Sequence, residues 1–288
     1  MKRALVASAL LTSIAASPAL ALDDDFASNA INTAVWLKRL PLTGSKALSG
    51  RDDELGLDGE VARLVYPANG PTWQWGPRYA TQISSRATAL YGAYEARMRS
   101  GRAARLDGVI SALFTYANDG GDWDGDGLID NHEIDIELSN TERSVLYLTV
   151  WTEYDDSTGV ERFHRIARRI DLATGEVWGT PVGGESDWDL VAYPSLPFAD
   201  ASFDHGAQYY TYGFDWEETS VAFWIDLEDG EGPRALWTLN GNPGDEIPSL
   251  PSPLFLNVWH NPVNWWTRAT APPATRNAVF RIDYVHGP

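Results

Sequence analysis

The chain has 288 residues, a formal net charge of −18 and no cysteine. Such an acidic surface disfavours nucleic acid and other polyanions as partners, and the lack of cysteine excludes disulfides and cysteine-linked lipid anchors. Hydrophobic residues form 44% of the sequence, a share that excludes an intrinsically disordered chain.

The first 21 residues have the pattern of a secretory signal peptide. Two basic residues precede a short apolar stretch, and residues 19–21 form an A-x-A cleavage site. The stretch is too short to span a membrane, and no later part of the chain has the run of about 18 apolar residues that a span requires. We therefore expect a secreted or periplasmic protein without a membrane partner, whose mature chain begins at Leu22.

Alternation of apolar and polar residues dominates the rest of the chain and predicts short β-strands. The predicted strands are residues 61–66, 91–99, 108–117, 132–138, 145–151, 162–170, 209–216, 220–226, 253–259 and 278–285. No repeat or linker divides them, so we expect one all-β domain over residues 22–288, an antiparallel sandwich of two sheets. Residues 118–131 and 171–207 are predicted as loops that either shape a binding site or are simply tolerated.

Residues 133–137 read E-I-D-I-E. Alternate residues of a strand share a face, so the isoleucines face the core while Glu133, Asp135 and Glu137 point together to the other side. A solvated outer face is one interpretation, although like charges on one face repel each other and acidic residues are poor strand formers. The spacing modestly favours a functional face.

The geometry of residues 133–137 is compatible with a site of two carboxylates but does not establish one. The α-carbons of residues 133 and 137 lie roughly 13 Å apart on a flat strand, at about 3.3 Å per residue. Retaining glycosidases hold their two carboxyl groups about 5–5.5 Å apart. Glutamate side chains that lean together on a concave sheet can close that gap.

The segment before this strand has the spacing of a calcium loop, D-x-D-x-D-G-x5-E, which ends at Glu133. Its candidate ligands are Asp122, Asp124, Asp126, the carbonyl of Leu128, and Asp130. Glu133 cannot both chelate an ion in the loop and face a cleft, and we assign it to the strand. A structural Ca²⁺ held by the remaining residues is expected; the alternative is an acidic, glycine-rich turn that holds no ion.

Blocks around residues 91–117, 132–138, 210–226 and 254–266 resemble, in this order, family 16 glycoside hydrolases, the endo-acting β-glucanases and their relatives. The likeness covers roughly residues 60–285, and the hallmark of that family is E-x-D-x-E on a strand of a concave sheet. The unbroken E-I-D-I-E resembles the branch of lichenases and xyloglucan transglycosylases. The resemblance implies a β-jelly-roll sandwich with a concave substrate cleft and a secreted, retaining β-glycosidase that hydrolyses a polysaccharide internally.

Carried over residue by residue, the resemblance makes Glu133 the nucleophile and Glu137 the general acid/base, with Asp135 hydrogen-bonded to the nucleophile. It implies no cofactor for catalysis. The positions that match substrate contacts of the family are Thr149, Trp151, Asn257 and Trp259. A polysaccharide is the expected partner of a monomeric protein.

Some positions depart from the pattern of the family. Gln82 and Ser84 stand where many members have a Glu-x-Arg pair, and Asn131 and His132 replace the Trp-Asp that precedes the first glutamate of lichenases. These changes leave the exact glucan undetermined. A neutral β-1,3-1,4- or β-1,3-glucan is expected. A transglycosylase on the same scaffold and a non-catalytic, calcium-stabilised carbohydrate-binding module are the alternative functions.

Overall fold

The computed structural model describes residues 22–28, 30–51, 60–70, 80–102, 107–118, 120–123, 125–155, 162–181, 190–263 and 270–288. Within these ranges the chain forms two antiparallel sheets and no helix, which confirms the predicted all-β sandwich. No helix long and apolar enough to cross a membrane occurs in the described ranges. The predicted signal peptide lies outside them.

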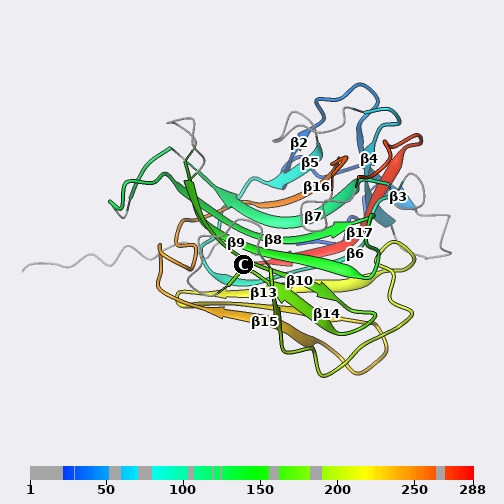
Figure 1. Cartoon of the computed structure of the whole chain (residues 1–288). Helices are drawn as coiled ribbons and strands as arrows, with labels where there is room; N and C mark the ends of the chain where they lie inside the picture. Colours follow the sequence, from blue (N-terminus) through cyan, green and yellow to red (C-terminus); the bar gives the residue numbers. More distant parts are fainter. Residues whose placement is uncertain are drawn as a thin grey trace, which may run out of the picture.

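One sheet has nine strands and is centred on the acidic segment. In spatial order its strands are β12 (Val191–Tyr193), β11 (Glu176–Gly179), β10 (Arg162–Asp171), β9 (Val145–Asp155), β8 (Asp130–Ser139), β7 (Val109–Ala117), β16 (Leu254–His260), β5 (Thr81–Ser85) and β2 (Trp36–Arg39). The strands β7, β8 and β9 curve along their length, and the hollow side of the curve faces away from the other sheet (Figure 1). This curvature gives the nine-stranded sheet a concave outer face.

The second sheet has eight strands and backs the first. In spatial order its strands are β15 (Arg234–Asn240), β14 (Ser220–Asp226), β13 (Tyr210–Glu217), β6 (Gly92–Arg99), β17 (Ala278–Gly287), β4 (Glu60–Tyr66) and β3 (Lys46–Arg51), and β1 (Leu22–Asp24) pairs with β17. Neither sheet closes on itself.

The hydrophobic core fills the space between the two sheets. Ile134 and Ile136 of β8 are fully buried there, in the same cluster as Tyr212 and Phe214 of β13 in the opposite sheet. Burial of large side chains from both sheets is the main stabilising contribution to such a sandwich. Packing in the core therefore fixes the inner face of β8, whereas the side chains on its outer face lie outside the core.

All ten predicted strands are present, and the structure adds β1, β2, β3, β5, β11, β12 and β15. The prediction of residues 171–207 as a loop is wrong in part, because β11 and β12 lie within it. Both are short, and β11 contributes one side chain, Val177, to the core cluster. So short an alternation leaves no clear signal in the sequence.

Candidate active site

The three acids of β8 lie together on the concave outer face. Asp135 is 7% exposed, Glu133 and Glu137 are half-buried, and the isoleucines between them are fully buried on the other side. Pairing of β8 with β9 is continuous from Glu133 to Glu137, and the register shift falls between Asp130 and Glu133. The E-I-D-I-E segment thus contains no bulge.

Hydrogen bonds connect the acids to one another and to β9. Glu133 is hydrogen-bonded by Asp135 and by Asn131, and the Trp151 side chain hydrogen-bonds Asp135. Burial and the charges of both glutamates hold the pKa of Asp135 well above its usual range, so its carboxyl keeps a proton to donate to Glu133. Asp135 is therefore placed to orient Glu133.

Both glutamates have raised pKa values. Burial raises the pKa of Glu133 to about 7, against the opposing hydrogen bonds from Asp135 and Asn131. Burial, helped by the charge of Glu133, raises the pKa of Glu137 to about 8, against the opposing charge of Arg165. Between these values the pair holds one ionised and one protonated carboxyl, the combination that nucleophilic and acid catalysis require.

Neighbouring strands place side chains beside each acid on the same face. The cross-strand partners on β7 and β9 are Tyr116 and Trp151 for Glu133, Phe114 and Thr149 for Asp135, and Ala112 and Tyr147 for Glu137. Beyond β9, Arg165 of β10 pairs with Trp151, and its guanidinium lies 5.2 Å from the centre of the Trp151 ring. Sequence reasoning missed Arg165, although alternation along residues 162–170 places it on the outer face.

The four predicted substrate residues share the face of the acids. Thr149 and Trp151 lie on β9, and Asn257 and Trp259 lie on β16 beyond the small Ala112. Within the described part of the chain, the Oδ1 atom of Asn257 is buried without a hydrogen-bond partner, which leaves an acceptor for a ligand hydroxyl.

The concave face also carries an aromatic cluster that sequence reasoning did not single out. Phe114 of β7 and Phe255 of β16 are stacked with ring centres 4.9 Å apart, and Tyr116 meets Phe255 edge-on at 6.3 Å. Gln82 and Ser84 of β5 pair with Asn257 and Phe255 on this face. This side of the concave face therefore has the neutral Gln82 and Ser84, beside an aromatic cluster, at the two positions where the resemblance predicts a Glu-x-Arg pair.

In the predicted calcium loop, Asp122 and Asp126 accept hydrogen bonds from backbone N–H groups of the loop itself. Asp122 accepts hydrogen bonds from the backbone N–H groups of Gly125 and Gly127, at 2.8 and 3.1 Å, and Asp126 accepts one from Leu128 at 2.7 Å. No group of three His, Asp or Glu side chains suited to a metal occurs among the described residues, and Asp124 lies outside them. A carboxylate can accept such hydrogen bonds and still bind an ion through its other lone pairs, so calcium stays a prediction.

Asp130, the last candidate ligand, has a different set of contacts. It is buried and accepts a 2.5 Å hydrogen bond from the backbone N–H of Trp123, while its other oxygen lies 3.1 Å from Nε2 of His132. Nδ1 of His132 accepts from the backbone N–H groups of Ser249 and Leu250, at 2.7 and 3.0 Å. His132 thus ties the start of β8 to the segment before β16.

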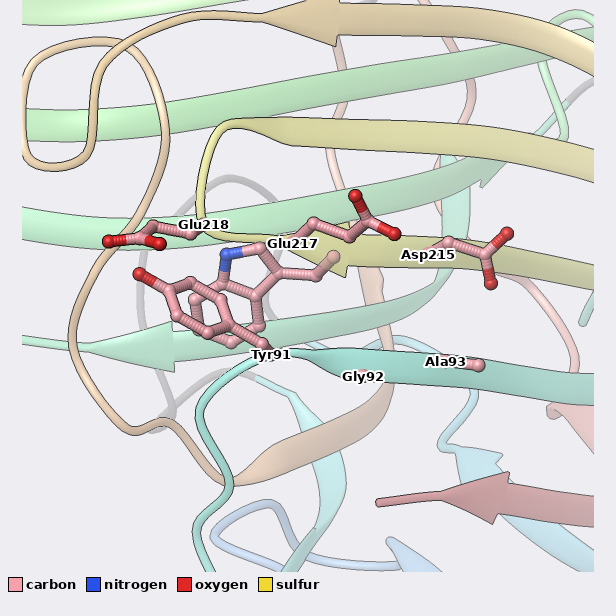
Figure 2. A pocket seen from close by; sticks show the side chains of 7 residues that line it. Tyr91, Gly92, Ala93, Asp215, Glu217 and Glu218 are labelled. Atoms are coloured by element: carbon pink, nitrogen blue, oxygen red, sulfur yellow. The ribbon is translucent and has the colours of Figure 1, made fainter.

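A separate hollow of about 390 Å³ lies at the start of β6 in the eight-stranded sheet. Figure 2 shows the Tyr91 side chain near Glu217 and Glu218, with Asp215 farther along β13. The ring of Tyr91 meets that of Trp216 edge-on, with ring centres 5.4 Å apart. The hollow contains none of the acids of β8 and no basic side chain in its lining. The concave face of the other sheet is therefore the candidate active site.

Comparison with known sequences agrees with this geometry. Residues 46–168, which include the acidic strand, match the family model of glycosyl hydrolases family 16. A beta-glucanase of Bacillus amyloliquefaciens is 24% identical over 172 residues, 59% of this chain and 48% of that protein. A xylanase/beta-glucanase of Ruminococcus flavefaciens is 25% identical over 199 residues, 68% of this chain and 18% of that protein. The chain spans less than half the length of these relatives.

Solved structures share the fold. Bacillus licheniformis beta-glucanase superposes with a TM-score of 0.53 at 20% identity, covering 93% of this chain and 97% of that one. LamA of Zobellia galactanivorans, solved as a variant with laminaritriose and laminaritetraose, has a TM-score of 0.54 at 15% identity, covering 94% and 99%. The Crh5 transglycosylase has a TM-score of 0.53 at 17% identity, covering 93% and 83%. The fold, the unbroken acidic strand and the match over residues 46–168 agree in their likeness to glycoside hydrolase family 16.

Proposed function

We propose that the protein is a secreted glycoside hydrolase that cuts a neutral β-linked glucan internally and retains the anomeric configuration. The observation that carries this proposal is the pair of half-buried glutamates on one concave face, with pKa values of about 7 and about 8. The match of residues 46–168 to the family model supports the reaction class. The signal-like residues 1–21 support secretion.

In the proposed first step, Glu137 donates its proton to the glycosidic oxygen while the carboxylate of Glu133 attacks the anomeric carbon. The bond from that carbon to the leaving sugar breaks, and a covalent glycosyl-enzyme forms on Glu133. In the second step the ionised Glu137 removes a proton from water, the water oxygen attacks the anomeric carbon, and Glu133 leaves as a carboxylate. Two inversions at one carbon give net retention.

Electrostatic coupling supports the change of role at Glu137. The charge of Glu133 is one cause of the raised pKa of Glu137. The glycosyl-enzyme has no charge on Glu133, so the pKa of Glu137 falls at the moment when it must act as a base. Asp135, held by Trp151, donates its hydrogen bond to the carboxylate of Glu133 in the resting enzyme and again when it leaves.

The substrate proposal rests on the groups that line the cleft. Trp151 and Trp259 offer aromatic faces for pyranose rings, and Oδ1 of Asn257 offers an acceptor for a hydroxyl. A net charge of −18 disfavours sulfated polymers. The relatives named beta-glucanase and the neighbour solved with laminari-oligosaccharides support a β-1,3-1,4- or β-1,3-glucan.

A transglycosylase is the second candidate, favoured by the likeness to the Crh5 transglycosylase. It would use the same residues, with a sugar hydroxyl in place of water in the second step. A non-catalytic binding module is less well supported, because both glutamates are present and Asp135 is hydrogen-bonded to Glu133.

Glu133→Ala and Glu137→Ala should each abolish hydrolysis and leave the fold intact, because each removes a reacting group from a face that does not pack in the core. Loss of polymer cleavage with unchanged circular dichroism would support the roles. NMR of the earliest products from the parent enzyme should show the β-anomer. Initial release of the α-anomer would refute the retaining mechanism.

Mixed-linkage β-1,3-1,4-glucan or β-1,3-glucan should be the best substrate when both are compared with xyloglucan and carrageenan under identical conditions. The reasons are the aromatic and neutral polar side chains of β9 and β16 on the concave face and the strong negative charge of the protein. Product sizing should show internal cleavage. A clear preference for the sulfated polymer would overturn the substrate proposal and leave the two-carboxylate mechanism standing.

The pH dependence should appear in rate and in stability. Rate should be bell-shaped, with limbs near the pKa values of about 7 and about 8. The folded pKa of Glu137 is above its ordinary value of 4.5, so the folded state retains a proton that the unfolded state releases, and stability falls as pH rises from about 4.5 to 8. Glu137→Gln should therefore gain unfolding free energy over the parent at pH 9 but not at pH 4.

Chemical denaturation at both pH values measures this difference. Glu217→Gln, at an exposed carboxylate of β13 in the other sheet, is the matched control and should show no such dependence. An equal effect of Glu137→Gln at pH 4 and pH 9 would contradict the assignment of a raised pKa.

Calcium should raise the melting temperature, and replacement of both Asp124 and Asp126 by Ala should remove that gain, because an ion that binds only the folded state stabilises it by mass action. Melting curves with calcium and with a chelator measure the effect. If the curves coincide and the purified protein contains no metal, the loop is a turn that needs no ion.

A further inference from the structure

Trp178 of β11 is a large aromatic side chain that the proposed mechanism does not use. It is 39% exposed. Across the described part of the chain its indole has no hydrogen-bond or ring partner. Tryptophan is enriched at interfaces, where its large apolar ring contacts a partner. Trp178 therefore has a free surface on which a ligand can lie.

The register of the sheet places Trp178 in one row with the proposed acid/base. Glu137 pairs with Tyr147 of β9, Tyr147 with Arg169 of β10, and Arg169 with Trp178 of β11. Directly paired residues share a face, so Trp178 lies on the same face as Glu137. Three strand spacings separate the two residues, roughly 14 Å, a distance that a bound oligosaccharide can span.

The residues around Trp178 leave its ring accessible and suit a neutral ligand. On the outer side it pairs with Ala192 of β12, which is small and exposed. On the inner side Arg169 forms a salt bridge with Glu142, which also accepts a hydrogen bond from the hydroxyl of Tyr147. The charge of Arg169 is thus neutralised within the protein and does not select an anionic ligand.

We propose that Trp178 is a remote sugar-binding subsite, which stacks on a pyranose ring of a long polysaccharide whose cleaved bond lies at Glu133 and Glu137. The inference rests on the proposed function and extends it, because it predicts a preference for long chains over short ones. A chain held at both places binds more tightly than one held at the cleft alone, since the second contact is intramolecular.

A second copy of the protein is the competing occupant of this surface. The neighbouring edge strand β12 has three residues, and Val191 on it is also exposed. A stable dimer buries about 800 Å² on each partner, far more than an indole and one valine provide. So short an edge strand also offers few backbone groups for sheet extension. These features favour a saccharide.

Binding should be measured in the Glu133→Gln background, which separates affinity from turnover. With Trp178→Ala added, affinity for mixed-linkage glucan polymer should fall about five- to tenfold, the range expected for loss of one aromatic stacking contact. Affinity for oligosaccharides too short to reach from the acids to β11 should stay the same. Trp178→Phe should keep most of the polymer affinity. Leu48→Ala, at an exposed apolar residue of β3 in the other sheet, is the matched control.

Three results would overturn the subsite: unchanged polymer affinity, equal loss for polymer and short oligosaccharides, and a parent dimer that Trp178→Ala converts to a monomer in sedimentation. A parent protein that binds glucan but releases no product would refute the proposed hydrolase alone. In that case a loss of polymer binding in Trp178→Ala would still support the subsite.

Discussion

The structure depends on one electrostatic constraint, the placement of three carboxyl groups on one face of a strand without free access to water. Burial opposes the ionisation of all three carboxyl groups, the charges of neighbouring acids add to this effect at Asp135 and Glu137, and all three pKa values are raised. The strand tolerates this arrangement because its other face is fully buried in the core. Packing on one side thus offsets an unfavourable electrostatic arrangement on the other, as is common where function opposes stability.

Residues of the neighbouring strands orient the acids of β8 and modify their pKa values. Asp135 is hydrogen-bonded to Glu133 and also accepts a hydrogen bond from Trp151. Arg165 lies over the ring of Trp151, and its charge opposes the rise in the pKa of Glu137. Trp151 is therefore a proposed contact surface for sugar and also one of the groups that influence the protonation of the acids. A substitution at Trp151 would change both properties, and its effects on binding and on pH dependence could not be separated.

The fold class and the shared face of the three acids could be predicted from the sequence because both follow from local alternation. The ten predicted strands and the common face of Glu133, Asp135 and Glu137 needed only a period of two. The missed features needed more than this period. Alternation places Arg165 on the outer face, but its position beside Trp151 follows from the pairing of β10 with β9, and β11 is too short to be recognised alone. The contacts of Asp130 likewise depend on His132 facing a segment more than a hundred residues away.

The position of β16 has a consequence for folding. This strand, residues 254–260, lies between β7 and β5, so it connects β5 and β2 to the rest of the concave sheet. Together with the contact of His132 to the segment before β16, it means that the concave face cannot assemble until residues 249–260 are available. Long-range pairing of this kind slows folding, because the entropy of closing large loops is lost before the contacts form. We infer that β7 and β8 pair early as a local hairpin, whose β7 edge stays open until a strand more than a hundred residues farther along the chain has been made.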